Sequence, residues 1–571
     1  MRIGDGNRPA SVGASGSQVA GNGAQSVPAQ AISDPRPAPR FVSEPRTTSG
    51  ARRVTLPTAT LPADSYAIPA QLFREMAPLY RASKEEGAIR DYARSLARTA
   101  NIELWAGKLE IRGPDRAGNI AIKVPGTGRF AKADRPVVAL QAHMDMVLAA
   151  DAVPPGGDLK AYFKANPVKL TEVDGVLRST EPRTSIGADD AIGVGLALRY
   201  VMDPRIEHPP LDILLTTSEE QGLTGARELE HEAMGFAPDV LVSLDALDKK
   251  NEGLLTVGSL GGRSNVFTGS VATTPVGWTE RAVEVVATGL TGGHSGTEIH
   301  LPRGNGVVWA AELLKAARAV APALRLSTMA VGDALNKIPA SGKVVIVGPM
   351  SAPFSEVRAA VEKRFKELCD ASGEKNAVMT AQQVKKPETA MTVEATEQLT
   401  SAILATPNGV IHRADPNGPE LPNGVRTSSN LARFLLADGK LELGVMSRSF
   451  DGPELQATAR RIADSLSRGF AASPQLTSSG YDPWLEDTRG ALVTRVLNEA
   501  RIDGKPAFTR VGFGNFGIET NIWRGIFPSL PMLAIGADTD GEHSSREQVS
   551  LASIAMTAKR LDALLQVLAS P

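Results

Sequence analysis

The chain has 571 residues, of which 42% are hydrophobic, and its 62 basic side chains nearly balance 63 acidic ones. This length allows two or three packed domains, and a net charge of -1 gives no electrostatic reason to expect nucleic acid or an anionic membrane as the main partner. The single cysteine, Cys369, excludes an intrachain disulfide framework and a metal site built from thiolates. No stretch approaches the roughly 18 apolar residues that a membrane-spanning helix needs.

Residues 1–64 differ in composition from the rest of the chain. They are rich in Gly, Ser, Ala, Pro and Asn and show no periodicity, a pattern that predicts a disordered leader. A start codon assigned too early would leave the same pattern. Because the segment has no apolar core of a secretory signal, we expect a cytoplasmic protein.

Helix-like and strand-like segments alternate over residues 65–262. Three short apolar runs, "RPVVALQAHMDMV", "PLDILLTTSEE" and "DVLVSLDALD", end in polar residues and are separated by helical patterns such as "DDAIGVGLALRYVM". Apolar runs of this kind predict a largely parallel sheet with helices on both faces. Ligands of such sheets bind beyond the carboxyl ends of the strands, which is where these runs carry their carboxylates.

The pattern changes over residues 263–477 and returns to the earlier one over residues 478–571. The middle segment contains two rounds of helix and strand patterns, from "RAVEVVATGL" to "FSEVRAAVEKRFKELCDAS" and from "EATEQLTSAILAT" to "PELQATARRIADSLSR". We therefore predict an α/β catalytic domain in two parts, 65–262 and 478–571. An α+β lid of two similar helix-on-sheet units, 263–477, interrupts it.

The run "LQAHMDMV" places His143 and Asp145 two residues apart, so that in a strand both side chains point to one face. A histidine with a carboxylate beside it is a common arrangement at metal sites, where the carboxylate orients the imidazole. The alternative is a buried histidine that is simply hydrogen-bonded.

Further carboxylates follow in "SIGADDAIGVG" and "TTSEEQGLTGA". Adjacent carboxylates repel each other unless a positive charge is near, so helix capping explains only one of Asp189 and Asp190 well. Strand alternation would send Glu219 and Glu220 to opposite sides, so that one could coordinate a metal while the other faces the substrate.

Asp245 follows the third apolar run, and His543 lies in the Gly- and Ser-rich loop "GADTDGEHSSREQV". Two histidines with strand-end carboxylates and no sulfur suit Zn²⁺, Co²⁺ or Mn²⁺ better than Ca²⁺ or Mg²⁺. The sequence therefore predicts a site for divalent metal ions.

The motifs "QAHMDMV", "SIGADDAIGVG", "TTSEEQGLTGA", "SLD", "GGHSGTEIH", "ATPNGVI" and "EHSSREQV" occur in an order that resembles the aminoacyl-histidine dipeptidases. These enzymes, also called Xaa-His dipeptidases or peptidase D, belong to the two-metal carboxypeptidase, aminoacylase and carnosinase clan. The resemblance runs from about residue 61 to the C-terminus. It implies two metal ions per subunit, with Zn²⁺ as the first choice, and a hydroxide shared between them that attacks the peptide.

The resemblance also assigns roles to individual residues. One metal would be held by His143 and Asp245, the other by Glu220 and His543, with Asp189 bridging the two. Glu219 would be the general base, Asp145 would fix the tautomer of His143, and the peptide bond after Asp189 would be cis.

Three lid residues are implicated in the same way. His294 would stabilise the oxyanion, Arg448 would bind the terminal carboxylate of the substrate, and Asn430 would line the same cleft. The residue-level alternatives are a solvent-exposed turn histidine at His294 and an ordinary salt bridge at Arg448. The family usually has a histidine and a cysteine where this chain has Asn515 and Thr520, which puts a preference for C-terminal histidine in doubt.

The predicted function is hydrolysis of short unblocked peptides, including Xaa-His dipeptides. Alternatives are a hydrolase of the same clan with another substrate (an aminoacylase, tripeptidase or carboxypeptidase) and a non-catalytic binding or assembly protein. We expect a short peptide as the only ligand besides the metals, and a homodimer as one oligomeric state. Because the lid contains two similar units, we also expect one unit to replace a partner and to supply His294 within the same chain.

Overall fold

The computed structural model describes residues 64–132, 135–153, 157–248, 251–416, 418 and 420–570. The predicted leader, apart from Asp64, lies outside the described residues. Among the described helices, none is both long and apolar enough to cross a membrane.

A mixed sheet carries the catalytic motifs, with the strand order β1-β2-β6-β3-β7-β26-β8-β22 and β25 paired to β8. Its four central strands, β6, β3, β7 and β26, run parallel to one another, as predicted for β3, β6 and β7 from their continuous apolar runs. Its strands are β1 (Glu110–Arg112), β2 (Ile120–Val124), β3 (Val138–His143), β6 (Leu211–Thr216), β7 (Val240–Ser243), β8 (Leu254–Ser259), β22 (Trp484–Leu485), β25 (Arg510–Gly514) and β26 (Met532–Ala534).

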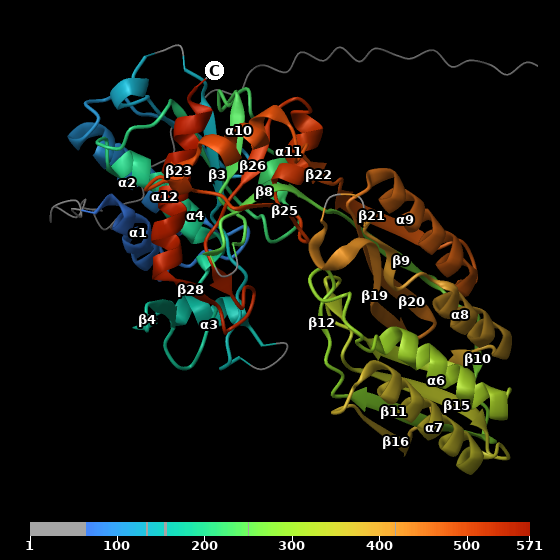
Figure 1. Cartoon of the computed structure of the whole chain (residues 1–571). Helices are drawn as coiled ribbons and strands as arrows, with labels where there is room; N and C mark the ends of the chain where they lie inside the picture. The colour runs from blue at the N-terminus through green and yellow to red at the C-terminus, as the bar shows by residue number, and fades with distance from the viewer. Residues whose placement is uncertain are drawn as a thin grey trace, which may run out of the picture. The chain divides into compact units, whose positions relative to one another are not determined.

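Helices cover both faces of this sheet (Figure 1). One face packs against α1 (Ile68–Met76), α2 (Gly87–Glu103), α4 (Ala188–Met202), α10 (Ala491–Glu499) and α12 (Leu551–Leu568). The other packs against α5 (Thr224–Arg227) and α11 (Thr520–Ile526). Helix α4 is buried on almost every side because its sequence is apolar all round. The predicted α/β class is thus confirmed.

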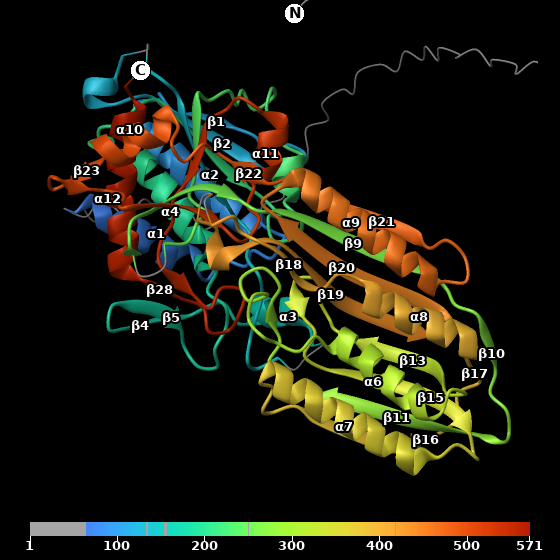
Figure 2. The same ribbon diagram turned by 45° about the vertical axis from the view of Figure 1, so that its right-hand side comes forward.

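A second, antiparallel sheet has the strand order β16-β11-β15-β13-β19-β20-β9-β21, with β18 paired to β19. Its strands are β9 (Gly261–Ser270), β11 (Glu280–Thr288), β13 (Arg325–Val331), β15 (Gly342–Pro349), β16 (Val378–Val384), β18 (Gly409–Arg413), β19 (Val425–Ala437), β20 (Lys440–Ser449) and β21 (Gln475–Tyr481). Helices α6 (Gly306–Val320), α7 (Phe354–Ser372), α8 (Val393–Ala405) and α9 (Gly452–Leu466) cover one face of it (Figure 2).

The predicted doubling is present in this second sheet, in a nested form. One unit runs β11-α6-β13-β15-α7-β16, and the other runs β9-α8-β19-β20-α9-β21, with the first unit inserted after β9. Both have the same spatial order of strands, and they join where β13 pairs with β19. The boundaries predicted for the lid, 263 and 477, stay a prediction.

Shorter elements lie outside these two sheets. A four-stranded sheet contains β27 (Thr539–Asp540), β28 (Gln548–Ser550), β5 (Val176–Ser179) and β4 (Leu170–Val173). Three two-stranded pairs are β10 (Thr273–Pro275) with β17 (Thr389–Met391), β12 (Gly293–His294) with β14 (Lys337–Ile338), and β23 (Arg501–Ile502) with β24 (Lys505–Pro506). Helix α3 spans Leu159–Ala165.

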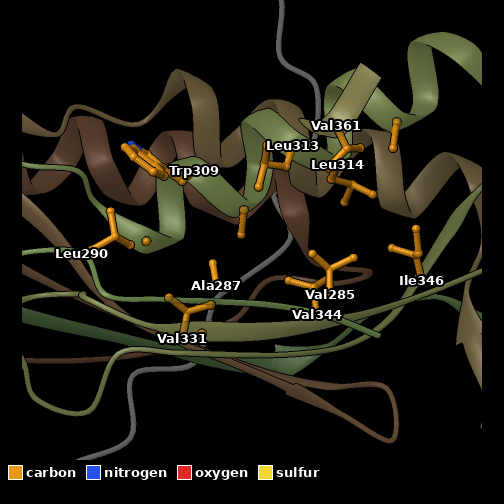
Figure 3. Close-up of a pocket in the computed structure, with 14 residues that line it drawn as sticks. Val285, Ala287, Leu290, Trp309, Leu313, Leu314, Val331, Val344, Ile346 and Val361 are labelled. Carbon is orange, nitrogen blue, oxygen red and sulfur yellow. The ribbon is translucent and has the colours of Figure 1, made fainter. Parts of the chain in front are cut away.

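The first lid unit contains an apolar cavity of about 50 Å³ between its helices and its sheet (Figure 3). Side chains of α6, including Trp309 and Leu314, face Val285 and Ala287 of β11 across it.

Candidate metal centre

The residues predicted to bind metal converge at the carboxyl ends of the central strands. His143 is the last residue of β3, Asp189 stands at the start of α4, and Asp245 follows β7. Glu220 follows β6, and His543 lies between β27 and β28. Parallel strands bring their carboxyl ends to one edge, so segments far apart in sequence meet there.

Asp189 lies between two groups of ligand atoms. Its Oδ1 is 3.0 Å from Nε2 of His143, and its Oδ2 is 3.2 Å from Nε2 of His543. His143, Asp189 and Asp245 offer ligand atoms within 4.8 Å of one another, and so do Asp189, Glu220 and His543. One carboxylate is therefore shared by two sets of three ligands.

The electrostatics of this cluster suit cations. Although burial acts to lower it, the carboxylates of Glu220 and Asp189 raise the pKa of His543 to about 12. Burial raises the pKa of Asp245 well above its usual value, and it also raises the pKa of Glu220. Glu220 Oε1 is buried and has no hydrogen-bond partner among the described residues. Crowded carboxylates and an unpartnered oxygen fit divalent ions held by oxygen and nitrogen.

Glu219 and Glu220 do not point in the directions that strand alternation predicts. Strand β6 ends at Thr216, and a turn through Ser218, with φ of +52°, carries Glu219 and Glu220. Both bring a carboxylate oxygen within 4.8 Å of a His143 nitrogen. The expectation that they point to opposite sides is wrong because alternation applies only within a strand.

Asp145 is completely buried and holds this turn in place. Its Oδ1 accepts from the backbone N–H of Glu219 at 3.0 Å and its Oδ2 from that of Glu220 at 3.2 Å. Ser83 Oγ donates to Oδ2 at 2.7 Å, and Nδ1 of His143 lies 3.5 Å from Oδ1. One carboxylate thus holds the backbone of both glutamates and lies beside the imidazole of His143.

The adjacent residues Asp189 and Asp190 have different positions, one suited to metal binding and the other to helix capping. The carboxylate of Asp190 accepts backbone N–H bonds from Gly193 at 3.1 Å and His143 at 3.2 Å, so it caps the helical turns that follow the kink at Asp189 and Asp190 near the start of α4. Asp189 instead faces the two histidines. The peptide bond between them is cis, as the resemblance implied.

Two buried residues that support Asp189 were not predicted. Glu547 Oε2 accepts from the N–H groups of Ile186 and Gly187, both at 2.8 Å, and burial raises the pKa of Glu547 to about 7. Arg81 donates to the carbonyl of Gly187 at 2.6 Å. The motif "EHSSREQV" contains Glu547 and could have indicated it, whereas no motif marks Arg81.

His294 lies in β12, and its tautomer follows from its contacts. Nδ1 is an acceptor for the backbone N–H groups of Gly296 at 3.3 Å and Thr297 at 3.2 Å, so Nε2 carries the proton. Burial, followed by the positive charges of Arg448 and His543, lowers the pKa of His294 to about 3. The imidazole is therefore neutral and has one N–H to donate.

The turn after His294 meets the catalytic segment of the same chain. A Cβ added to Gly296 would lie 2.7 Å from the backbone oxygen of Asn515. The turn of His294 thus lies against the segment that carries Asn515.

Arg448 lies near the end of β20 and is buried, with 5% of its surface exposed. None of the described Asp or Glu residues lies within 4.0 Å of its guanidinium, and its Nε has no partner there. A buried guanidinium without a carboxylate is costly unless an anion binds to it. The salt-bridge alternative is thus not seen among the described residues.

Asn430 is buried, and both ends of its amide are engaged within the lid. Its Oδ1 accepts from Asn305 at 3.1 Å, and its Nδ2 donates to the carbonyl of Lys337 at 2.6 Å. Lys337 pairs with His294 between β14 and β12. These contacts make Asn430 a support for His294, and a substrate contact stays a prediction.

The segment that departs from the family pattern lies behind the metal cluster. Glu519 is buried and accepts from Gln141 Nε2 and, at 2.5 Å, from Thr216 Oγ1. Burial raises its pKa to about 7. Thr520, at the position of the usual cysteine, is also buried.

Comparison with known proteins agrees with this geometry. No family model matches the chain. The cytosol non-specific dipeptidase of Escherichia coli (strain K12) is 28% identical over 450 residues, which are 77% of this chain and 86% of that protein. The crystal structure of an aminoacylhistidine dipeptidase from Vibrio alginolyticus superposes with a TM-score of 0.67 and 24% identity, covering 89% of this chain and 98% of that one. The resemblance to dipeptidases stated from the motifs is confirmed, and the structural match shows the fold.

Proposed function

We propose that this chain is a metal-dependent dipeptidase that hydrolyses short unblocked peptides. The observation that carries the proposal is the position of Asp189 between two three-ligand groups, each with a histidine. Such a shared carboxylate would let these residues hold two divalent cations in one site. The proposed ligands are His143, Asp189, Glu220, Asp245 and His543.

A bound pair of divalent cations would supply Lewis-acid activation of the attacking water. Glu219 is the proposed general base, which accepts the proton of that water and delivers it to the leaving amine. Burial, opposed by the charge of His143, raises the pKa of Glu219 well above its usual value. Asp145 keeps Glu219 in reach by accepting its backbone N–H.

Lid residues act on the two ends of the substrate in this proposal. The Nε2–H of His294 donates to the oxygen that becomes negative when the peptide carbonyl is attacked. The guanidinium of Arg448 binds the C-terminal carboxylate, for which its planar fork is suited. A binding protein without catalysis would need neither a base nor an oxyanion donor.

The metal is proposed to be Zn²⁺, with Co²⁺ and Mn²⁺ as alternatives, because the donors are nitrogen and oxygen. The E. coli relative is named a cytosolic enzyme, and we propose the same compartment. We also propose that the site is completed within one chain, a proposal supported by the close approach of the His294 turn to Asn515.

The decisive experiment combines metal analysis with a substrate panel. The purified protein is stripped with a chelator, reconstituted with each metal, and assayed on Xaa-His dipeptides, other dipeptides, tripeptides and N-acetyl amino acids. We expect about two ions per chain and hydrolysis of free dipeptides that returns with the metal. Faster hydrolysis of acetylated amino acids would favour an aminoacylase, and no hydrolysis by the metal-loaded protein would contradict the proposal.

A further inference from the structure

Tyr481 lies where the chain passes from the lid sheet back to the catalytic sheet. It is the last residue of β21, and β22 begins three residues later. We propose that the hydroxyl of Tyr481 is a second donor, beside Arg448, to the C-terminal carboxylate of the substrate. This inference rests on the proposed dipeptidase function and adds a specificity-determining residue to it.

The register of three neighbouring strands carries the argument. Gly262 of β9 is directly opposite Arg448 of β20 on one side and opposite Tyr481 of β21 on the other. Residues directly opposite each other on antiparallel strands present their side chains on the same face. Arg448 and Tyr481 therefore share one face of the sheet, with a residue that has no side chain between them.

The absence of a side chain at Gly262 lets the tyrosine ring occupy the intervening space. A Cβ added to Gly262 would lie 3.0 Å from both Cζ and the hydroxyl oxygen of Tyr481. Such a distance is shorter than ordinary carbon–carbon contacts of 3.5–4.0 Å. The tyrosine ring thus lies over Gly262, on the side toward Arg448.

A second glycine confines the hydroxyl from the catalytic side. A Cβ added to Gly517 would overlap the ring and the hydroxyl of Tyr481. Gly517 belongs to the segment "GNFGIET", in which Asn515 and Thr520 replace the residues usual in the family. The hydroxyl therefore lies between strand β21 of the lid and the catalytic segment that contains Gly517.

The charges that act on Tyr481 come from both ends of the proposed substrate site. After burial, which raises the pKa of Tyr481, the strongest influences are the positive charge of Arg448 and the negative charge of Glu219. In a dipeptide only one residue separates the scissile carbonyl from the terminal carboxylate. A hydroxyl that shares a sheet face with Arg448 and feels the charge of Glu219 suits a position beside that residue, where a neutral phenol donates to an anion.

The backbone on both sides of Tyr481 is fixed to the catalytic part of the chain. Arg227 donates to the carbonyl of Gly480 at 2.6 Å, and Asn521 donates to the carbonyl of Asp482 at 2.9 Å. The hydroxyl is therefore positioned before substrate binds, which lowers the entropic cost of using it as a ligand.

The test is Tyr481→Phe, which keeps the ring over Gly262 and removes only the hydroxyl. The free dipeptide that the wild type hydrolyses fastest is compared with its C-terminal amide, in steady-state kinetics of the metal-loaded protein. We expect KM for the free dipeptide to rise about tenfold or more, as for a lost hydrogen bond to a charged group. KM for the amide should stay within about twofold, because the amide lacks the anion.

Two controls separate this role from a structural one. Tyr162→Phe removes a hydroxyl from helix α3 and should leave KM unchanged for both substrates. The double variant Arg448→Gln with Tyr481→Phe should raise KM for the free dipeptide by less than the two single effects combined, because both side chains bind one group.

An equal KM increase for the free dipeptide and the amide, or no increase for either, would overturn the inference while leaving the dipeptidase proposal intact. Failure of the wild type to hydrolyse any free dipeptide would instead contradict the proposed function.

Discussion

The carboxylate of Glu547 accepts a hydrogen bond from the backbone N–H of Asp189 at 3.2 Å, across 358 positions of sequence. The same carboxylate also accepts from Ile186 and Gly187. It therefore holds the backbone at the point where Asp189 must face both histidines. A residue that holds the backbone beside a proposed ligand can in this way control the geometry of the metal centre.

Glu547→Gln should weaken metal binding while the chain remains folded. A glutamine offers one acceptor oxygen instead of two, so at least one of the three N–H groups loses a partner. We expect the affinity for the metal to fall about 10- to 100-fold, as for other supporting residues of metal sites. Competition with a chromogenic chelator measures this affinity. Glu499→Gln, on an exposed residue of α10, is the matched control, and equal affinities of the two variants would contradict the role.

Glu219→Gln should abolish most of the activity without releasing metal. The amide cannot accept the proton of the attacking water, and removal of a general base costs about 10²–10⁴-fold in kcat. Metal content by mass spectrometry should equal that of the wild type, since the proposed ligands are unchanged. A variant that keeps both its metal and more than a tenth of its kcat would mean that another group is the base.

The stability of the chain should depend on pH through His208. This histidine is fully buried, its Nδ1 lies 2.7 Å from the carbonyl oxygen of Pro209, and its ring meets Tyr200 edge-on. Burial lowers its pKa to about 4, so below about pH 6.5 the unfolded chain binds a proton that the folded chain refuses. Folding stability is therefore lost as the pH falls from about 6.5 towards 4.

The measurement compares urea unfolding of the wild type and His208→Phe at pH 7 and pH 5. From pH 7 to pH 5 the free energy of unfolding of the wild type should fall by on the order of 2 kcal/mol more than that of the variant, which has no imidazole at position 208. Because both proteins share every other titrating group, loss of metal in acid affects them alike. Parallel pH profiles would show that His208 does not set the dependence.

Filling the lid cavity should stabilise the fold. Ala287 of β11 faces the cavity of about 50 Å³ (Figure 3), and Ala287→Val adds two carbons with a side chain that suits a strand. Cavity-filling substitutions commonly add about 0.5–2 kcal/mol. Leu314→Ala enlarges the same cavity and should lower the free energy of unfolding by about 2–5 kcal/mol. Thermal unfolding of both variants checks the pair, and a lower melting temperature for Ala287→Val would show that the space is too tight.

Local sequence patterns predicted the elements of the catalytic sheet and the residues of the metal cluster. The apolar runs around His143, Glu219 and Asp245 identify strands because burial on both faces selects continuous apolar residues. Parallel strands then bring His143 and the carboxylates that follow β6 and β7 to one edge. Asp189 and His543 lie at a helix start and in a loop, and the resemblance assigned their roles.

The turn that carries Glu219 and Glu220 could not be derived in the same way. Periodicity predicts side-chain direction only while the strand continues, and β6 ends at Thr216. Direction beyond that point depends on Asp145, which accepts both backbone N–H groups. The nested lid was also missed in part, because β9 of the second unit precedes the whole first unit.

The sequence by itself thus determined the α/β class, the doubled lid and the identity of the candidate ligands, since each depends on neighbours in the chain. Only the tertiary structure decided which residues support them: Glu547 behind Asp189, Asn430 behind the strand of His294, and Tyr481 beside Arg448. Those partners come from distant segments, and their meeting depends on strand register and close approach at glycines. Neither leaves a periodic signal in the residues themselves.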